Sequence, residues 1–118
     1  MKIISDKTHG ILDYVTAALF ALAPGVLGLT GTAALISYAL AGIHLIMTVL
    51  TDMPLGIVKI IPMRLHALVE MLVGPILVIG ALALPNLMVG GRGFFIIAGL
   101  GIFVVWMLSL YGTEPRPA

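Results

Sequence analysis

Four long apolar stretches dominate this sequence of 118 residues, over about 11–29, 33–50, 65–84 and 93–110. Each is close to the roughly 20 residues that a helix needs to cross about 30 Å of hydrocarbon. In lipid, every backbone N–H and C=O must be paired within its own segment, so stretches of this kind form helices. The sequence therefore predicts an all-α integral membrane protein with four transmembrane helices.

The composition supports a chain that lies in a lipid bilayer. Hydrophobic residues make up 61% of the sequence and charged residues only 9%, whereas about a quarter of a soluble domain is charged. So few charges exclude a disordered segment and give no basis for nucleic-acid binding. The absence of cysteine excludes a disulfide scaffold. The predicted partners are the bilayer itself and other membrane proteins or further copies of the chain.

The basic residues predict the orientation of the helices. One predicted side, with both termini and the middle connection, carries five of them, and the other side carries only Arg92. Because short loops rich in Lys and Arg remain on the cytoplasmic side, both termini should be cytoplasmic. The five residues on the predicted cytoplasmic side are Lys2, Lys7, Lys59, Arg64 and Arg116.

The sequence also resembles itself when it is shifted by 57 residues. His9 then meets His66, and Asp13 meets Glu70, so a histidine followed four residues later by a carboxylate occurs at the same depth in the first and third helices. This pattern predicts a tandem duplication of a two-helix hairpin, with repeats at about 5–52 and 62–110 and an interfacial connection at 51–64. Two helices per unit make the repeats parallel. The alternative is two unrelated amphipathic helix starts.

A proline near the end of the first helix of each hairpin carries a resemblance to a known group. The matching stretches are 22–29 (LAPGVLGL) with 39–43 (ALAGI), and the shorter 83–85 (ALP). They resemble small bacterial membrane proteins built from SPW-type repeats, although the Ser and Trp of that motif are absent here. The resemblance implies a multi-pass protein of the bacterial inner membrane and implies no activity.

The ionisable residues of the apolar helices gather at one depth. Asp13, Glu70 and His44 each lie eight residues from a predicted cytoplasmic helix end (5 to 13, 62 to 70, 44 to 52), which is roughly 12 Å at the rise of a helix. His9 and His66 lie one turn nearer the surface. Because ionisable groups are costly against lipid, these five side chains are expected to converge inside the bundle.

Four interpretations of this constellation remain open. In the first, the histidines and carboxylates pair with one another and tie the repeats together. In the second, they bind a metal such as Zn, Fe or Mn. In the third, His44 is an axial ligand of a haem, and Gly101, which meets it at the shift of 57, leaves room for the macrocycle. In the fourth, the cluster relays protons or a cation across the membrane. The metal ligands would be His9, Asp13, His44, His66 and Glu70.

No set of residues in the sequence indicates catalysis. There is no cysteine nucleophile, and no serine, histidine and acid set reads as a hydrolase. The sequence predicts a small non-enzymatic membrane protein, a subunit or partner of a larger complex, whose buried cluster joins the two repeats. Metal or haem binding and proton or cation transport are the alternative functions.

Overall fold

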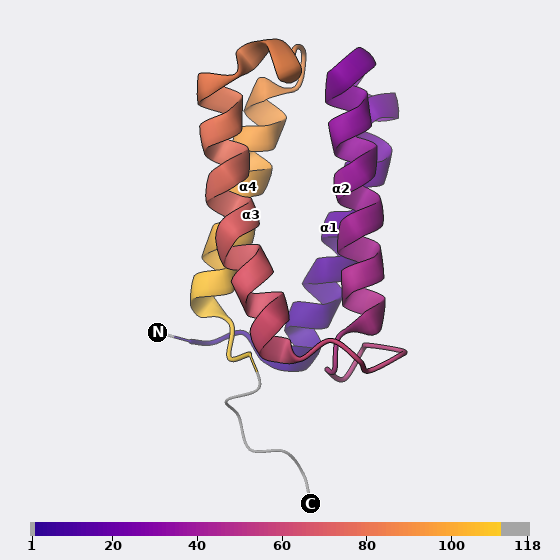
Figure 1. Cartoon of the computed structure of the whole chain (residues 1–118), viewed down its shortest axis with the longest axis vertical. Helices are drawn as coiled ribbons and strands as arrows, with labels where there is room; N and C mark the ends of the chain where they lie inside the picture. The colour runs from indigo at the N-terminus through magenta and orange to yellow at the C-terminus, as the bar shows by residue number, and fades with distance from the viewer. Residues whose placement is uncertain (1, 112–118) are drawn as a thin grey trace, which may run out of the picture.

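The computed structural model describes residues 2–111, and their regular secondary structure is helical, as predicted (Figure 1). The helices are α1 (Asp6–Leu27), α2 (Gly31–Leu50), α3 (Met63–Ala83) and α4 (Arg92–Leu108), with a short 3-10 turn, η1 (Pro85–Leu87), between the last two. Strand-like pairing in this part of the chain is limited to two isolated bridges. The prediction of an all-α chain with four helices is confirmed.

Local signals explain where the first helix begins and ends. Ser5 caps α1, because its side-chain oxygen accepts a hydrogen bond of 3.2 Å from the backbone N–H of Thr8. The helix therefore starts at Asp6, five residues before the apolar stretch. Gly28 ends it in the left-handed conformation with φ of 69°, which a glycine adopts at little cost.

The helices pack as two hairpins, α1 with α2 and α3 with α4 (Figure 1). The second hairpin is held by a contact between two glycines. A Cβ on Gly74 would lie 2.9 Å from the carbonyl oxygen of Gly99, and a Cβ on Gly99 would lie 2.7 Å from that of Gly74. Only residues without a side chain let the two backbones approach this closely.

On one side of the molecule, the first residues of each hairpin pair with the last residues of the other hairpin. Ile4 bridges Ser109, which joins the beginning of the first hairpin to the end of the second. Ile61 bridges Thr51, which joins the beginning of the second hairpin to the end of the first. The chain is therefore tied at this end, while the turns inside both hairpins lie at the opposite end (Figure 1).

The buried positions of the two hairpins correspond, but with two different spacings. Buried residues of α1 recur in α3 57 positions later, as with Ala17 and Gly74. Buried residues of α2 recur in α4 58 positions later, as with Ser37 and Phe95. A uniform shift of 57 therefore does not match the buried positions of the second helices. The position that corresponds to His44 is the buried Ile102, not the exposed Gly101.

The outer surface of the hairpins is apolar. Large hydrophobic side chains on every helix are exposed, up to 78% at Val26 and 72% at Ile97. Within residues 2–111, three helices, α1, α2 and α3, are long and apolar enough to cross a membrane, and α4 is a shorter apolar helix. A surface of this kind is unfavourable in water, since exposed apolar patches of soluble monomers are small.

We predict that Gly99→Ala will separate α3 from α4. The new methyl group would meet the backbone of Gly74, so the free energy of unfolding should fall by about 1–3 kcal/mol. The midpoint of unfolding by sodium dodecyl sulfate measures the change. Gly101→Ala is the matched control, because a Cβ there meets nothing within 4 Å. Equal stability of the two variants would contradict the contact.

Candidate metal centre

All five ionisable residues singled out from the sequence are buried and lie in one cluster. His9 and Asp13 come from α1, His44 from α2, and His66 and Glu70 from α3. His9 and His66 have no exposed surface, and the other three are at most 7% exposed. The spacing of four residues puts each histidine on the same helix face as its carboxylate, and the docking of the hairpins brings the two pairs together.

Two imidazole nitrogens and two carboxylate oxygens form a closed ring at the centre of the cluster. His9 Nε2 lies 3.2 Å from Asp13 Oδ2 and 3.1 Å from Glu70 Oε1. His66 Nε2 lies 3.0 Å from Asp13 Oδ2 and 2.7 Å from Glu70 Oε1. Nitrogen and oxygen atoms therefore alternate around the ring. Helices α1 and α3 each supply one nitrogen and one oxygen.

The outer nitrogen of each of these two histidines is held by a hydroxyl group from the end of a hairpin. His9 Nδ1 lies 2.7 Å from Ser109 Oγ, and His66 Nδ1 lies 2.7 Å from Thr51 Oγ1. Both hydroxyl groups also donate to a backbone carbonyl one turn earlier, Ser109 to Val105 and Thr51 to Met47.

These contacts determine that Nδ1 of each ring carries a proton. A hydroxyl group has one hydrogen, and here it is donated to the backbone carbonyl, so the hydroxyl oxygen must accept a hydrogen bond from Nδ1–H. With Nδ1 protonated, a neutral imidazole presents the bare lone pair of Nε2 to the carboxylates. Two lone pairs and two carboxylate oxygens would then face each other in an apolar interior, which is stable only if positive charge lies between them.

The two carboxylates are oriented by partners outside the ring. His44 Nε2 lies 3.3 Å from Asp13 Oδ1, the oxygen that points away from His9 and His66. The hydroxyl group of Tyr111 donates to Glu70 Oε2. Burial, together with the Glu70 carboxylate, raises the pKa of the Tyr111 phenol, so this group remains a donor. The left-handed backbone of Tyr111, with φ of 48°, is unusual for a residue other than glycine.

One oxygen of the ring lacks a hydrogen-bond donor. Asp13 Oδ2 is buried and accepts no hydrogen bond within residues 2–111, although both Nε2 atoms are close to it. The four inner atoms lie within 4.8 Å of one another. A tetrahedral Zn²⁺ site with bonds of 2.0–2.1 Å has ligand atoms about 3.3 Å apart. The ring therefore has nearly the size and the donor types of a site for a divalent metal.

Sequence reasoning missed Thr51, Ser109 and Tyr111. Thr51 and Ser109 are 58 positions apart, so they correspond to each other at the spacing of the second helices and not at 57. Matching the second helices separately would have paired the two hydroxyl residues. Tyr111 has no hydroxyl counterpart, because the residue 58 positions earlier is Met53.

No protein-family model, curated protein or solved structure matches this chain. The assignment of the site is therefore argued from the chain's own residues.

We predict that the cluster stabilises the docked hairpins through Glu70. Glu70→Leu leaves two imidazoles and the Tyr111 hydroxyl group without their partner, and should lower the free energy of unfolding by about 3–5 kcal/mol. Glu70→Gln keeps an acceptor oxygen and should cost much less. Unfolding in sodium dodecyl sulfate measures both variants. Equal losses would contradict the role of the carboxylate as an acceptor.

Proposed function

We propose that this chain is a small, non-enzymatic, multi-pass membrane protein whose centre of His9, Asp13, His66 and Glu70 binds one divalent metal ion and thereby joins two hairpins. The observation that carries the proposal is the ring of two imidazole nitrogens and two carboxylate oxygens, in which hydroxyl groups hold both outer nitrogens. One divalent ion would balance both carboxylates and leave both histidines neutral.

The surroundings of the ring support a metal more than a simple set of hydrogen bonds. Metal ligands in proteins are held by a second layer of hydrogen bonds that fix their orientation. Here each ligand has one such partner. Ser109 contacts His9 and Thr51 contacts His66. His44 contacts Asp13 and Tyr111 contacts Glu70. Two nitrogen and two oxygen donors suit Zn²⁺, Fe²⁺ or Mn²⁺.

The same ring offers a second candidate state, in which protons replace the metal. If both Nε2 atoms carry a proton, two imidazolium groups balance two carboxylates, and the cluster only ties the hairpins together. The close approach of both nitrogens to Glu70 Oε1 favours this state in the absence of metal. Metal binding would then release the two protons, so the two states exclude each other.

The other two interpretations receive less support from the geometry. Iron could bind His44 only through Nδ1, the nitrogen nearer the α2 backbone, because His44 Nε2 lies against Asp13 Oδ1. A transport path needs polar groups beyond the cluster, and the cavity that continues from the cluster is lined mainly by aliphatic and aromatic side chains. Haem binding by His44 and cation transport therefore rank below the metal centre.

The membrane placement and the origin of the hairpins are part of the proposal. The apolar exposed surface and the three long apolar helices support insertion in a membrane, for which we propose the inner membrane of a bacterium. The matching buried positions at spacings of 57 and 58 support a tandem duplication with parallel repeats. The basic residues favour cytoplasmic termini, with the connection at 51–64 along the interface.

We predict that the full-length protein, purified in detergent and stripped of metal, binds one Zn²⁺ per chain. Replacing the zinc with Co²⁺ should give the visible absorption of a four-coordinate nitrogen and oxygen site. The double substitution His9→Ala and His66→Ala should abolish binding, because it removes both nitrogen ligands. Isothermal titration and elemental analysis measure the stoichiometry.

His44→Ala is the matched control for this experiment. It removes a histidine that lies outside the ring, so zinc binding should persist with an affinity about 10–100-fold lower. The affinity of the unaltered protein should rise with pH, because metal and protons compete for the same nitrogens. The metal centre would be contradicted if the unaltered protein is stably folded and binds no zinc.

We predict that both termini are cytoplasmic. Alkaline phosphatase is active only outside the cytoplasm, so its fusion after Ala118 should be inactive in bacterial cells, and a fusion in the turn at Gly28 should be active. Activity of the Ala118 fusion would overturn the orientation derived from the basic residues.

A further inference from the structure

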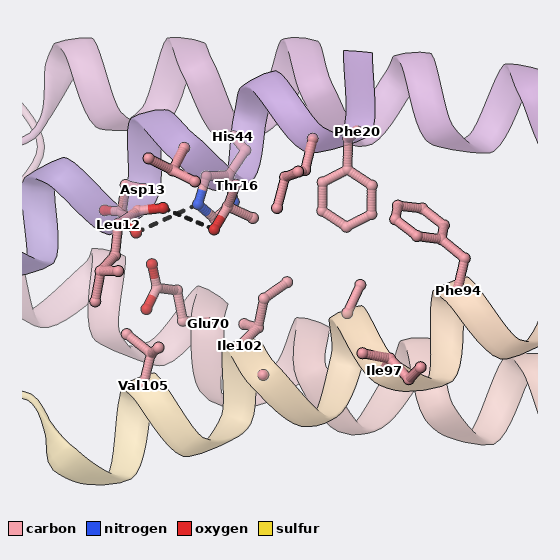
Figure 2. Close-up of a pocket in the computed structure, with 14 residues that line it drawn as sticks. Leu12, Asp13, Thr16, Phe20, His44, Glu70, Phe94, Ile97, Ile102 and Val105 are labelled. Atoms are coloured by element: carbon pink, nitrogen blue, oxygen red, sulfur yellow. Dashed lines mark hydrogen bonds and ion pairs between the residues drawn. The ribbon is translucent and has the colours of Figure 1, made fainter. Parts of the chain in front are cut away.

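A cavity of about 300 Å³ lies between the two hairpins, directly beside the metal centre (Figure 2). Asp13, His44 and Glu70 line one end of it. At the other end Phe20 and Phe94 meet edge to face, with ring centroids 5.6 Å apart. The remaining lining residues come from α1 and α4, and all of them except Thr16 are apolar.

The cavity opens on the apolar surface of the hairpins. Three residues that line it are also largely exposed: Val15 at 49%, Leu19 at 55% and Ile97 at 72%. If the helices span a membrane, this opening faces lipid. Water gains little in such a space, because a buried water molecule needs two or more polar partners and the long walls offer almost none. An apolar chain fits the walls better.

The polar end of the cavity offers hydrogen-bond acceptors rather than donors. Because His44 Nε2 contacts the Asp13 carboxylate, the tautomer that fits this contact has its proton on Nε2 and its lone pair on Nδ1. Nδ1 makes no hydrogen bond to any residue from 2 to 111. The hydroxyl group of Thr16 donates to the carbonyl of Leu12, so its oxygen can only accept as well. This end therefore matches a ligand that donates, as a hydroxyl group does.

The depth of the polar end selects an uncharged ligand. Asp13 lies seven residues beyond the first residue of α1, about 10 Å along the helix axis. A phosphate head group drawn to this depth would lose its hydration, which is costly in hydrocarbon. A hydroxyl group is much easier to bury, provided that it finds an acceptor.

We propose that this cavity binds an uncharged, lipid-soluble molecule with a hydroxyl head, such as a long-chain alcohol or a quinol, which enters from the bilayer between α1 and α4. The chain of the ligand lies along the apolar walls, and its hydroxyl group donates to His44. The inference rests on the proposed membrane placement and not on the metal, because the His44 nitrogen that it uses lies outside the ring.

The test uses the full-length protein in phosphatidylcholine vesicles and a photoreactive dodecanol with a diazirine in its chain. Labelled positions are mapped by mass spectrometry of peptides. Labelling should concentrate on the residues of α1 and α4 that line the cavity. Excess 1-dodecanol should suppress it, whereas dodecane and dodecyl phosphate should not. His44→Leu should weaken the competition by 1-dodecanol about fivefold to tenfold, the net effect of one hydrogen bond.

Two glycines of α4 provide a matched pair of variants. Both have open space around a new Cβ, but Gly101 lines the cavity and Gly93 does not. Gly101→Leu should abolish labelling that 1-dodecanol can suppress, and Gly93→Leu should retain it, with helical circular dichroism unchanged in both. Equal labelling of the two variants would overturn the proposal, as would equal competition by dodecane, which would show that the head is not recognised. Zinc binding measured on the same sample tests the metal centre separately.

Discussion

The structure depends on the balance of charge between two buried carboxylates and two buried imidazoles. Asp13 and Glu70 point toward each other inside an apolar bundle, where an unbalanced pair of negative charges would prevent the hairpins from docking. His9 and His66 can provide that balance in two ways, by binding a metal between them or by taking up protons. In either state the positive charge lies at the contact between the hairpins, so it controls their association.

The backbone and the centre stabilise each other. Ser109 and Thr51 lie in short bridges, each of which connects the end of one hairpin to the beginning of the other. Their hydroxyl groups orient His9 and His66. The hydroxyl group of Ser109 reaches His9 only when the second hairpin has closed against the first. The imidazole orientation that suits a metal therefore exists only in the docked arrangement.

The cavity beside the centre also results from the way the two hairpins dock. The hairpins touch at the polar cluster and again near the Phe20–Phe94 pair, and α1 and α4 do not close the space between these contacts (Figure 2). His44 connects the two features, since it contacts Asp13 and also lines the cavity. A ligand in the cavity and an ion in the ring would thus meet through one imidazole.

The sequence by itself determined the helices and the pairing of His9 with Asp13 and of His66 with Glu70, because hydropathy and helical periodicity are local properties. Only the tertiary structure decided that the two pairs form a ring. It also decided that Thr51, Ser109 and Tyr111 hold that ring, and that Ile102, 58 positions after His44, is buried. These relations depend on how the hairpins dock. Docking joins residues up to 106 positions apart, as in the hydrogen bond from Leu110 N–H to the carbonyl of Ile4, and no local pattern encodes such a distance.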